Sequence, residues 1–133
     1  MKTTSTSKGF TIIELLFVIV LISAASVLFF VQKNNLEVAN RDETRKTAIN
    51  ALYYSIEEVY FTSNKHYPRT IDTSVLPSVD PTLFKDPSGV QIGEATSEYR
   101  YEPYNCDGDV CKNYTLRTTL ENEDDYVKTN RSN

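Results

Sequence analysis

The sequence of 133 residues predicts an α+β fold, in which one long N-terminal α-helix packs on a small antiparallel β-sheet. The chain opens with an uninterrupted apolar run over residues 10–31. A stretch with a one-sided apolar pattern follows, and there is neither glycine nor proline between Phe10 and Tyr67. Two segments of alternating polarity, typical of strands, lie in the second half of the chain. A hydrophobic content of 40% also argues against disorder.

The apolar run predicts a membrane-entering segment. Its 22 residues, from Phe10 to Val31, contain a single charge, Glu14. At about 1.5 Å per residue, such a helix is long enough to cross a hydrocarbon layer of about 30 Å. Lys2 and Lys8 precede the run, which favours a cytoplasmic N-terminal side and places the rest of the chain outside.

Three interpretations fit this N-terminus. It can be a secretory signal peptide with a cleavage site of small residues at Ser23–Ser26, or a plain uncleaved membrane anchor. Both leave the acid at position 14 without a reason. The third interpretation uses the residues 8–15, KGFTIIEL, together: a short basic leader, then glycine, an aromatic residue and an acid at fixed spacing.

These residues resemble the processing site of bacterial type IV pilins and the related pseudopilins. The resemblance implies that a prepilin peptidase cuts between Gly9 and Phe10, that the new amino terminus at Phe10 is N-methylated, and that Glu14 is the family's fifth-position glutamate. It also implies the pilin fold and an assembly platform with its ATPase as partners. The subunit would be stored in the inner membrane as a single-pass protein. It would then assemble with copies of itself or with other pilins into an extracellular filament.

The position of Glu14 can be explained physically. A charged carboxylate at the centre of a bilayer costs at least about 2.5 kcal/mol, so an acid there needs a partner. After cleavage, that partner is the α-amine of Phe10, in the same chain or in a neighbouring subunit. A pair between subunits forms only at certain axial offsets, so Glu14 would set register during assembly. The simpler alternative is that Glu14 complements the helix dipole, which is worth about 0.3–1 kcal/mol.

We divide the chain into a cleaved leader (1–9), a transmembrane or filament-core helix (10–31), its amphipathic continuation (32–63) and a small head (64–133). Small residues at Ser23–Ser26 suit close helix contacts. The expected buried stripe of the continuation is Ala48, Ile49, Leu52, Ile56, Val59 and Tyr60; the expected polar side includes Arg45, Lys46, Glu57 and Glu58. Asn64 and Pro68 should end the helix.

The head should contain a connecting loop over residues 69–96, pinned to the helix by Leu76, Val79, Leu83 and Phe84, and then a β-hairpin. The expected strands are Ser97–Tyr104 and Asn113–Leu120, with a short third strand around Tyr126–Thr129. Cys106 and Cys111 should form a disulfide, because a nearby pair in an exported domain usually does. If it bridges the hairpin directly, the residues expected to face each other are Tyr101 and Leu116, Tyr99 and Thr118, and Arg100 and Arg117.

The sequence offers little evidence of a metal site, an enzyme or a nucleic-acid-binding surface. Asp107 and Asp109 are weak metal candidates, because with Asn105 they fall short of the six to eight oxygen ligands of Ca²⁺, and Asp-Gly is ordinary turn chemistry. His66 fits a surface loop. No enzyme constellation occurs, so we expect neither catalysis nor a cofactor. The net charge of −4, which becomes −6 when Lys2 and Lys8 are removed, argues against a uniformly nucleic-acid-binding surface without excluding local basic patches.

The sequence therefore predicts a structural subunit of a type IV pilus, that is, of an extracellular fimbrial filament. Two alternatives lie in the same class: a pseudopilin of a type II secretion system, and a minor or tip-located pilin. A membrane-anchored or secreted binding domain is the alternative from a different class.

Overall fold

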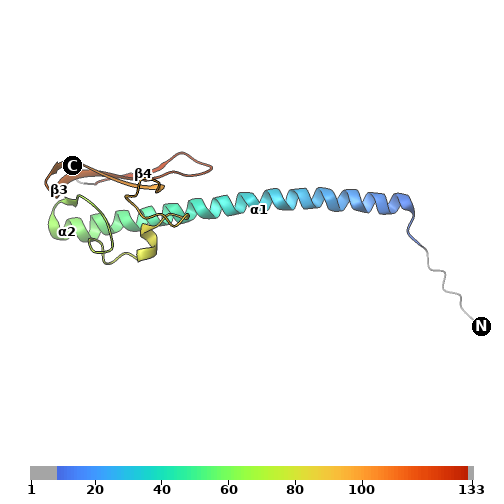
Figure 1. Cartoon of the computed structure of the whole chain (residues 1–133), viewed down its shortest axis with the longest axis horizontal. Helices are drawn as coiled ribbons and strands as arrows, with labels where there is room; N and C mark the ends of the chain where they lie inside the picture. The colour runs from blue at the N-terminus through green and yellow to red at the C-terminus, as the bar shows by residue number, and fades with distance from the viewer. Residues whose placement is uncertain (1–8, 132–133) are drawn as a thin grey trace, which may run out of the picture. The chain divides into compact units, whose positions relative to one another are not determined.

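The computed structural model describes residues 9–131, and the chain divides into two compact units, residues 1–37 and residues 38–133. Its elements follow in the order α1 (Ile12–Tyr54), the π-helix η1 (Ser55–Tyr60), α2 (Phe61–Asn64), β1 (Tyr67–Pro68), the 3-10 helix η2 (Pro81–Phe84), β2 (Tyr99–Asp107), β3 (Val110–Thr118) and β4 (Tyr126–Thr129). Figure 1 shows these elements along the chain. The predicted α+β architecture, a long N-terminal helix packed on a small antiparallel sheet, is confirmed.

The helical part runs from Ile12 to Asn64, interrupted only by the π-helical turn. It ends where the sequence predicts. Lys65 adopts a left-handed conformation (φ 62°) and donates its backbone N–H to the carbonyl of Phe61 at 2.8 Å, while the Asn64 amide donates to the carbonyl of Tyr60. These bonds satisfy carbonyl groups that the end of a helix leaves open.

The sheet has four strands, and β3 is its central strand. β2 pairs with β3 along its whole length, while β1 and β4 share the other edge of β3 at different heights. The predicted register is confirmed, since Tyr101 faces Leu116, Tyr99 faces Thr118 and Arg100 faces Arg117. The third strand also lies where it was expected. The two-residue strand β1 was not predicted.

The core of residues 38–133 lies between the second part of α1, the connecting loop and the sheet. Leu76, Val79 and Phe84 are buried there and Leu83 packs partly against them, which confirms that the loop is pinned to the helix. The core consists of Ala48, Ile49, Leu52, Tyr53, Ile56, Tyr67, Ile71, Leu76, Val79, Phe84, Ile92, Tyr99, Cys111, Tyr114 and Leu116.

The predicted helix stripe is correct up to Ile56 and wrong at Val59, which is 49% exposed. The reason is the π-helix, because its wider turns break the three-and-four spacing on which the prediction rested. Glu57, expected on the polar side, is instead 7% exposed. Arg45 is also buried, contrary to expectation, because three carboxylates surround its guanidinium.

Candidate functional site

The N-terminal end of α1 begins with a capping residue, Thr11. Its hydroxyl accepts the backbone N–H of Glu14 at 3.3 Å, and its carbonyl accepts the N–H of Leu15 at 3.0 Å. Threonine is a favoured residue at this position because its side chain satisfies one of the four N–H groups that a helix start leaves open. Gly9 and Phe10 therefore lie outside the helix, directly before its cap.

The predicted site residues Gly9, Phe10 and Glu14 all lie exposed on this end of the chain, and the Phe10 side chain is 78% exposed. Among residues 9–131, no side chain forms an ion pair with the Glu14 carboxylate. Gly9 has open space where a Cβ would lie. The rest of the predicted leader, residues 1–8, lies outside the described residues.

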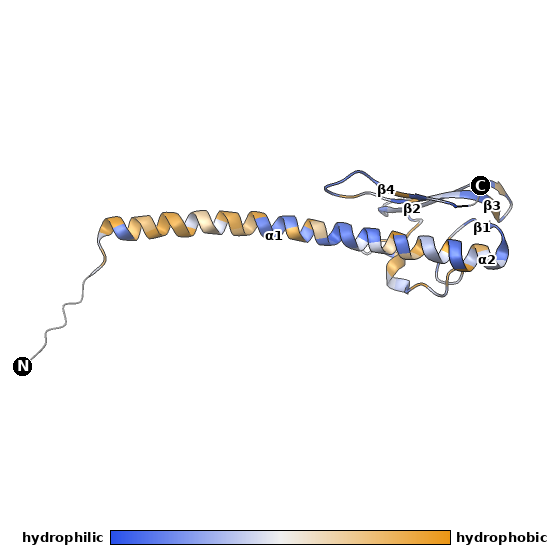
Figure 2. Cartoon of the chain, turned by 180° about the vertical axis from the view of Figure 1, so that it is seen from behind, coloured by the Kyte–Doolittle hydropathy of each residue, from blue (hydrophilic) through white to orange (hydrophobic). Residues whose placement is uncertain are grey.

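The first part of α1 is apolar on all sides, as Figure 2 shows. Every large hydrophobic side chain between Phe10 and Val31 is exposed within the chain. The helix is long and apolar enough to cross a membrane by length and composition. Residues 10–31 therefore form a membrane-compatible segment whose large apolar side chains are exposed.

The two serine hydroxyls in this segment are already hydrogen-bonded. The Ser23 hydroxyl donates to the carbonyl of Val20, and the Ser26 hydroxyl donates to that of Ile22, both at 2.8 Å. Such bonds let serine enter an apolar environment without an unpaired donor. Beside Ser26 and Ala25, the larger Ile22, Phe29 and Phe30 border a shallow hollow of about 490 Å³.

A buried charge cluster that was not predicted lies on α1 within residues 38–133. The Arg45 guanidinium contacts Asp42 at 2.9 Å, Glu98 at 2.7 Å and Glu121 at 2.9 Å. The carboxylate of Asp42 also accepts the backbone N–H groups of Glu121 and Asn122. The cluster joins the helix to the start of β2 and to the loop after β3.

The surroundings change the acidity of these groups. Burial alone would raise the pKa of Asp42, but the two backbone N–H groups and Arg45 outweigh burial and lower it. Hydrogen bonds from Arg41 and Arg45 lower the pKa of Glu121 to about 2. Both carboxylates are therefore charged at neutral pH. The only sequence signal for the cluster was the spacing of Asp42 and Arg45, three apart on one helix face.

A second buried polar group is the Glu57 carboxylate, in the π-helix. It accepts the hydroxyls of Tyr67 at 3.2 Å and Tyr114 at 2.8 Å, and the backbone N–H of Arg131 at 3.2 Å. Burial, together with the bond to this carboxylate, raises the pKa of Tyr114 well above its usual range. These three donors explain how an acid can lie 7% exposed beneath the sheet.

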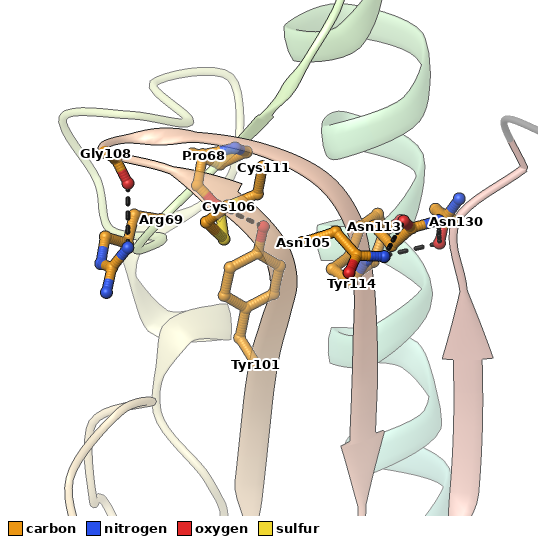
Figure 3. Close-up of a disulfide and its surroundings, with 10 residues drawn as sticks. All are labelled: Pro68, Arg69, Tyr101, Asn105, Cys106, Gly108, Cys111, Asn113, Tyr114 and Asn130. Carbon is orange, nitrogen blue, oxygen red and sulfur yellow. Dashed lines mark hydrogen bonds between the residues drawn. A yellow bond between two sulfur atoms is a disulfide. The ribbon is translucent and has the colours of Figure 1, made fainter.

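The predicted disulfide between Cys106 and Cys111 is present and lies near the tip of the β2–β3 hairpin (Figure 3). Gly108, at φ 60°, is the first residue of the two-residue turn, where glycine adopts this conformation without steric cost. Its carbonyl accepts a bond from Arg69, and the Tyr101 hydroxyl donates to the carbonyl of Pro68. The hairpin tip is thereby attached to the segment that follows α2.

The weak metal candidates end up in this same turn. Asp107 closes β2 and Asp109 follows Gly108. Within residues 9–131, no group of three or more His, Cys, Asp and Glu side chains is arranged to hold a metal ion. His66 lies half-buried in the turn after α2, where its Nδ1 contacts the carbonyl of Asn64 at 2.8 Å.

Comparisons of the chain with protein-family profiles, with curated proteins and with solved structures found no match.

Proposed function

We propose that this chain is a structural subunit of the type IV pilin class. In this proposal it is held in the inner membrane by residues 10–31, cut between Gly9 and Phe10, and assembled through its apolar helix into an extracellular filament. The observation that carries the proposal is an exposed apolar helix whose N-cap, Thr11, directly follows Gly9 and Phe10, and which has one acid, Glu14, in its first turn.

The apolar surface of residues 10–31 supports this role, because lipid or other protein has to cover it both before and after assembly. Contiguous apolar patches of this size are rare on soluble monomers and mark contacts with lipid or with other proteins. Lipid can cover the helix before assembly, and the same helices of other copies can cover it afterwards. The hydroxyls of Ser23 and Ser26, which donate to backbone carbonyls of the same helix, suit both surroundings.

The Glu14 carboxylate supports the proposal that this residue sets the register between subunits during assembly. Its backbone N–H is bound by the cap, but its carboxylate forms no ion pair among residues 9–131. A free α-amine at Phe10 would supply the missing cation once the chain is cut. Copies that pair in this way neutralise two charges that an apolar filament core would otherwise penalise.

The first test is the N-terminus of the protein purified from membranes, measured by mass spectrometry. The proposal expects a chain that begins with N-methylated Phe10. A chain that begins at Ser26 or Val27 would identify a signal peptide, and an intact Met1 would identify a plain anchor. Either result would refute the proposal.

The second test compares Glu14→Ala with Glu37→Ala, a matched change at an exposed glutamate of the same helix that pairs with Lys33. We expect both variants to enter the membrane and to be cut, and only Glu14→Ala to lose incorporation into filaments. Equal filament yields from the two variants would rule out the register role. Quantifying the subunit in purified filaments then separates a major pilin from a minor pilin, and co-purification with a secretion apparatus would favour a pseudopilin.

A further inference from the structure

The last part of the chain is attached to the rest of residues 38–133 in an unusual way. We call Glu121–Arg131, which includes β4, the C-terminal strap. None of its residues is fully buried, and Val127 is 48% exposed. Tyr126 alone packs partly against the core, and its hydroxyl donates to the Asn50 side chain at 3.0 Å. β4 pairs with β3 only from Thr115 to Thr118. Apolar burial therefore contributes little to holding this segment in place.

Polar contacts hold the N-terminal end of the strap on α1, and we call them the front anchor. The Glu121 carboxylate binds Arg41 at 2.6 and 2.7 Å and Arg45 at 2.9 Å. Asp42 accepts the backbone N–H groups of Glu121 and Asn122, and Lys46 pairs with Glu123 at 2.8 Å.

Polar contacts also hold the C-terminal end of the strap, on the π-helix η1 and its neighbours, and we call them the rear anchor. The Arg131 backbone N–H donates to Glu57 at 3.2 Å, and its guanidinium donates to the Tyr53 hydroxyl at 3.1 Å and pairs with Glu58. Asn130 accepts the backbone N–H of Tyr114 at 3.3 Å. Both ends of the strap thus depend on charged or hydrogen-bonded groups of the helix.

The neighbouring β2–β3 hairpin is held differently. Its strands pair from Tyr99 to Asp107 and from Val110 to Thr118, a disulfide joins them, and their tyrosine and leucine side chains fill the core. Regions with few buried apolar contacts open at lower free energy than the core of the same protein. The two parts should therefore differ in local stability.

We infer that the C-terminal strap is a separate cooperative unit, closed on α1 and η1 by polar contacts at its two ends, that opens while the β2–β3 hairpin and the core stay folded. Opening frees the edge of β3 at Thr115–Thr118, whose backbone groups can then pair with another strand. Because the two anchors close one short strand between them, loss of either anchor weakens the whole strap. This inference does not depend on the proposed function.

Amide hydrogen exchange of the full chain in detergent micelles, with the disulfide intact, tests the inference. We expect strap amides, such as those of Val127 and Thr129, to exchange faster than amides of the β2–β3 ladder. Asp42→Ala at the front anchor and Arg131→Met at the rear anchor should each accelerate exchange along the entire strap by at least about tenfold, and the strap amides should stay faster than those of the β2–β3 ladder, which opens only with the core.

Glu37→Gln is the matched control, because it removes a carboxylate of α1 that pairs with Lys33 at 3.6 Å and lies outside both anchors. It should leave strap exchange unchanged. About 1 M NaCl, which screens exposed ion pairs, should accelerate strap exchange in the wild-type chain. Acceleration confined to the altered end, or strap amides that exchange no faster than those of the β2–β3 ladder in the wild-type chain, would overturn the inference.

Discussion

Arg45→Met should destabilise residues 38–133 by about 3 kcal/mol. The Arg45 side chain is 3% exposed, and removing its charge leaves three carboxylates without their shared cation. Breaking a buried ion pair by removing one partner costs about 3–5 kcal/mol. The lower end applies here, because Glu98 and Glu121 are 33% and 34% exposed and can be hydrated, and Asp42 keeps two backbone N–H partners.

Urea unfolding in detergent, followed by tyrosine fluorescence, measures this loss. The chain has nine tyrosines and no tryptophan, and all the tyrosines lie beyond residue 50, so the signal reports on the second unit alone. We expect Arg45→Met to lower the urea midpoint by about 1–3 M. Arg41→Met is the matched control, because its pair with Glu121 is 40% exposed on the arginine side and should be worth less than about 1 kcal/mol. Equal effects of the two variants would refute the assignment of Arg45 as a buried centre of charge.

Three further results follow from the contacts. The pKa values of Asp42 and Glu121 are lowered in the folded chain. The stability that these two carboxylates contribute is therefore complete above their ordinary pKa values and is lost as the pH falls. Urea midpoints should be flat near neutral pH and decline between about pH 4.5 and about 2. Reducing the disulfide, which closes a short loop, should cost roughly 2 kcal/mol, read from midpoints with and without reductant. Tyr99→Phe should not destabilise the protein, because the Tyr99 hydroxyl is buried and has no hydrogen-bond partner among residues 9–131. Tyr114→Phe should cost about 1–3 kcal/mol by leaving a buried carboxylate short of a donor.

The features predicted correctly from the sequence depend on short-range regularity. The length of the helix followed from the missing glycine and proline, and the hairpin register followed from two facts that agree: alternating polarity and the spacing of Cys106 and Cys111. The strand Tyr126–Thr129 was also visible as a short apolar and aromatic segment. Such patterns need no knowledge of which elements lie opposite one another.

The features that were missed depend on long-range partners. Arg45 looked like a solvated side chain because Glu98 and Glu121, which surround it, lie far away in the sequence. Glu57 looked solvated because its donors come from Tyr67, Tyr114 and Arg131. The π-helix itself turns Glu57 inward, and a pattern built on 3.6 residues per turn cannot register that change.

In the proposed function, the Glu14 carboxylate pairs with an amine at Phe10, and the structure of the helix start bears on which copy supplies that amine. In the uncut chain, the Thr11 hydroxyl already satisfies the backbone N–H of Glu14, so the helix start does not need the Glu14 side chain for that bond. Helix formation and charge pairing are thus assigned to two different groups. Phe10 lies before the cap, outside the helical hydrogen-bond ladder, so an amine created there would not be fixed by helix geometry against its own Glu14. That freedom lets the amine pair with the Glu14 carboxylate of another copy as well as with its own, and it is the pair between copies that can set an axial offset.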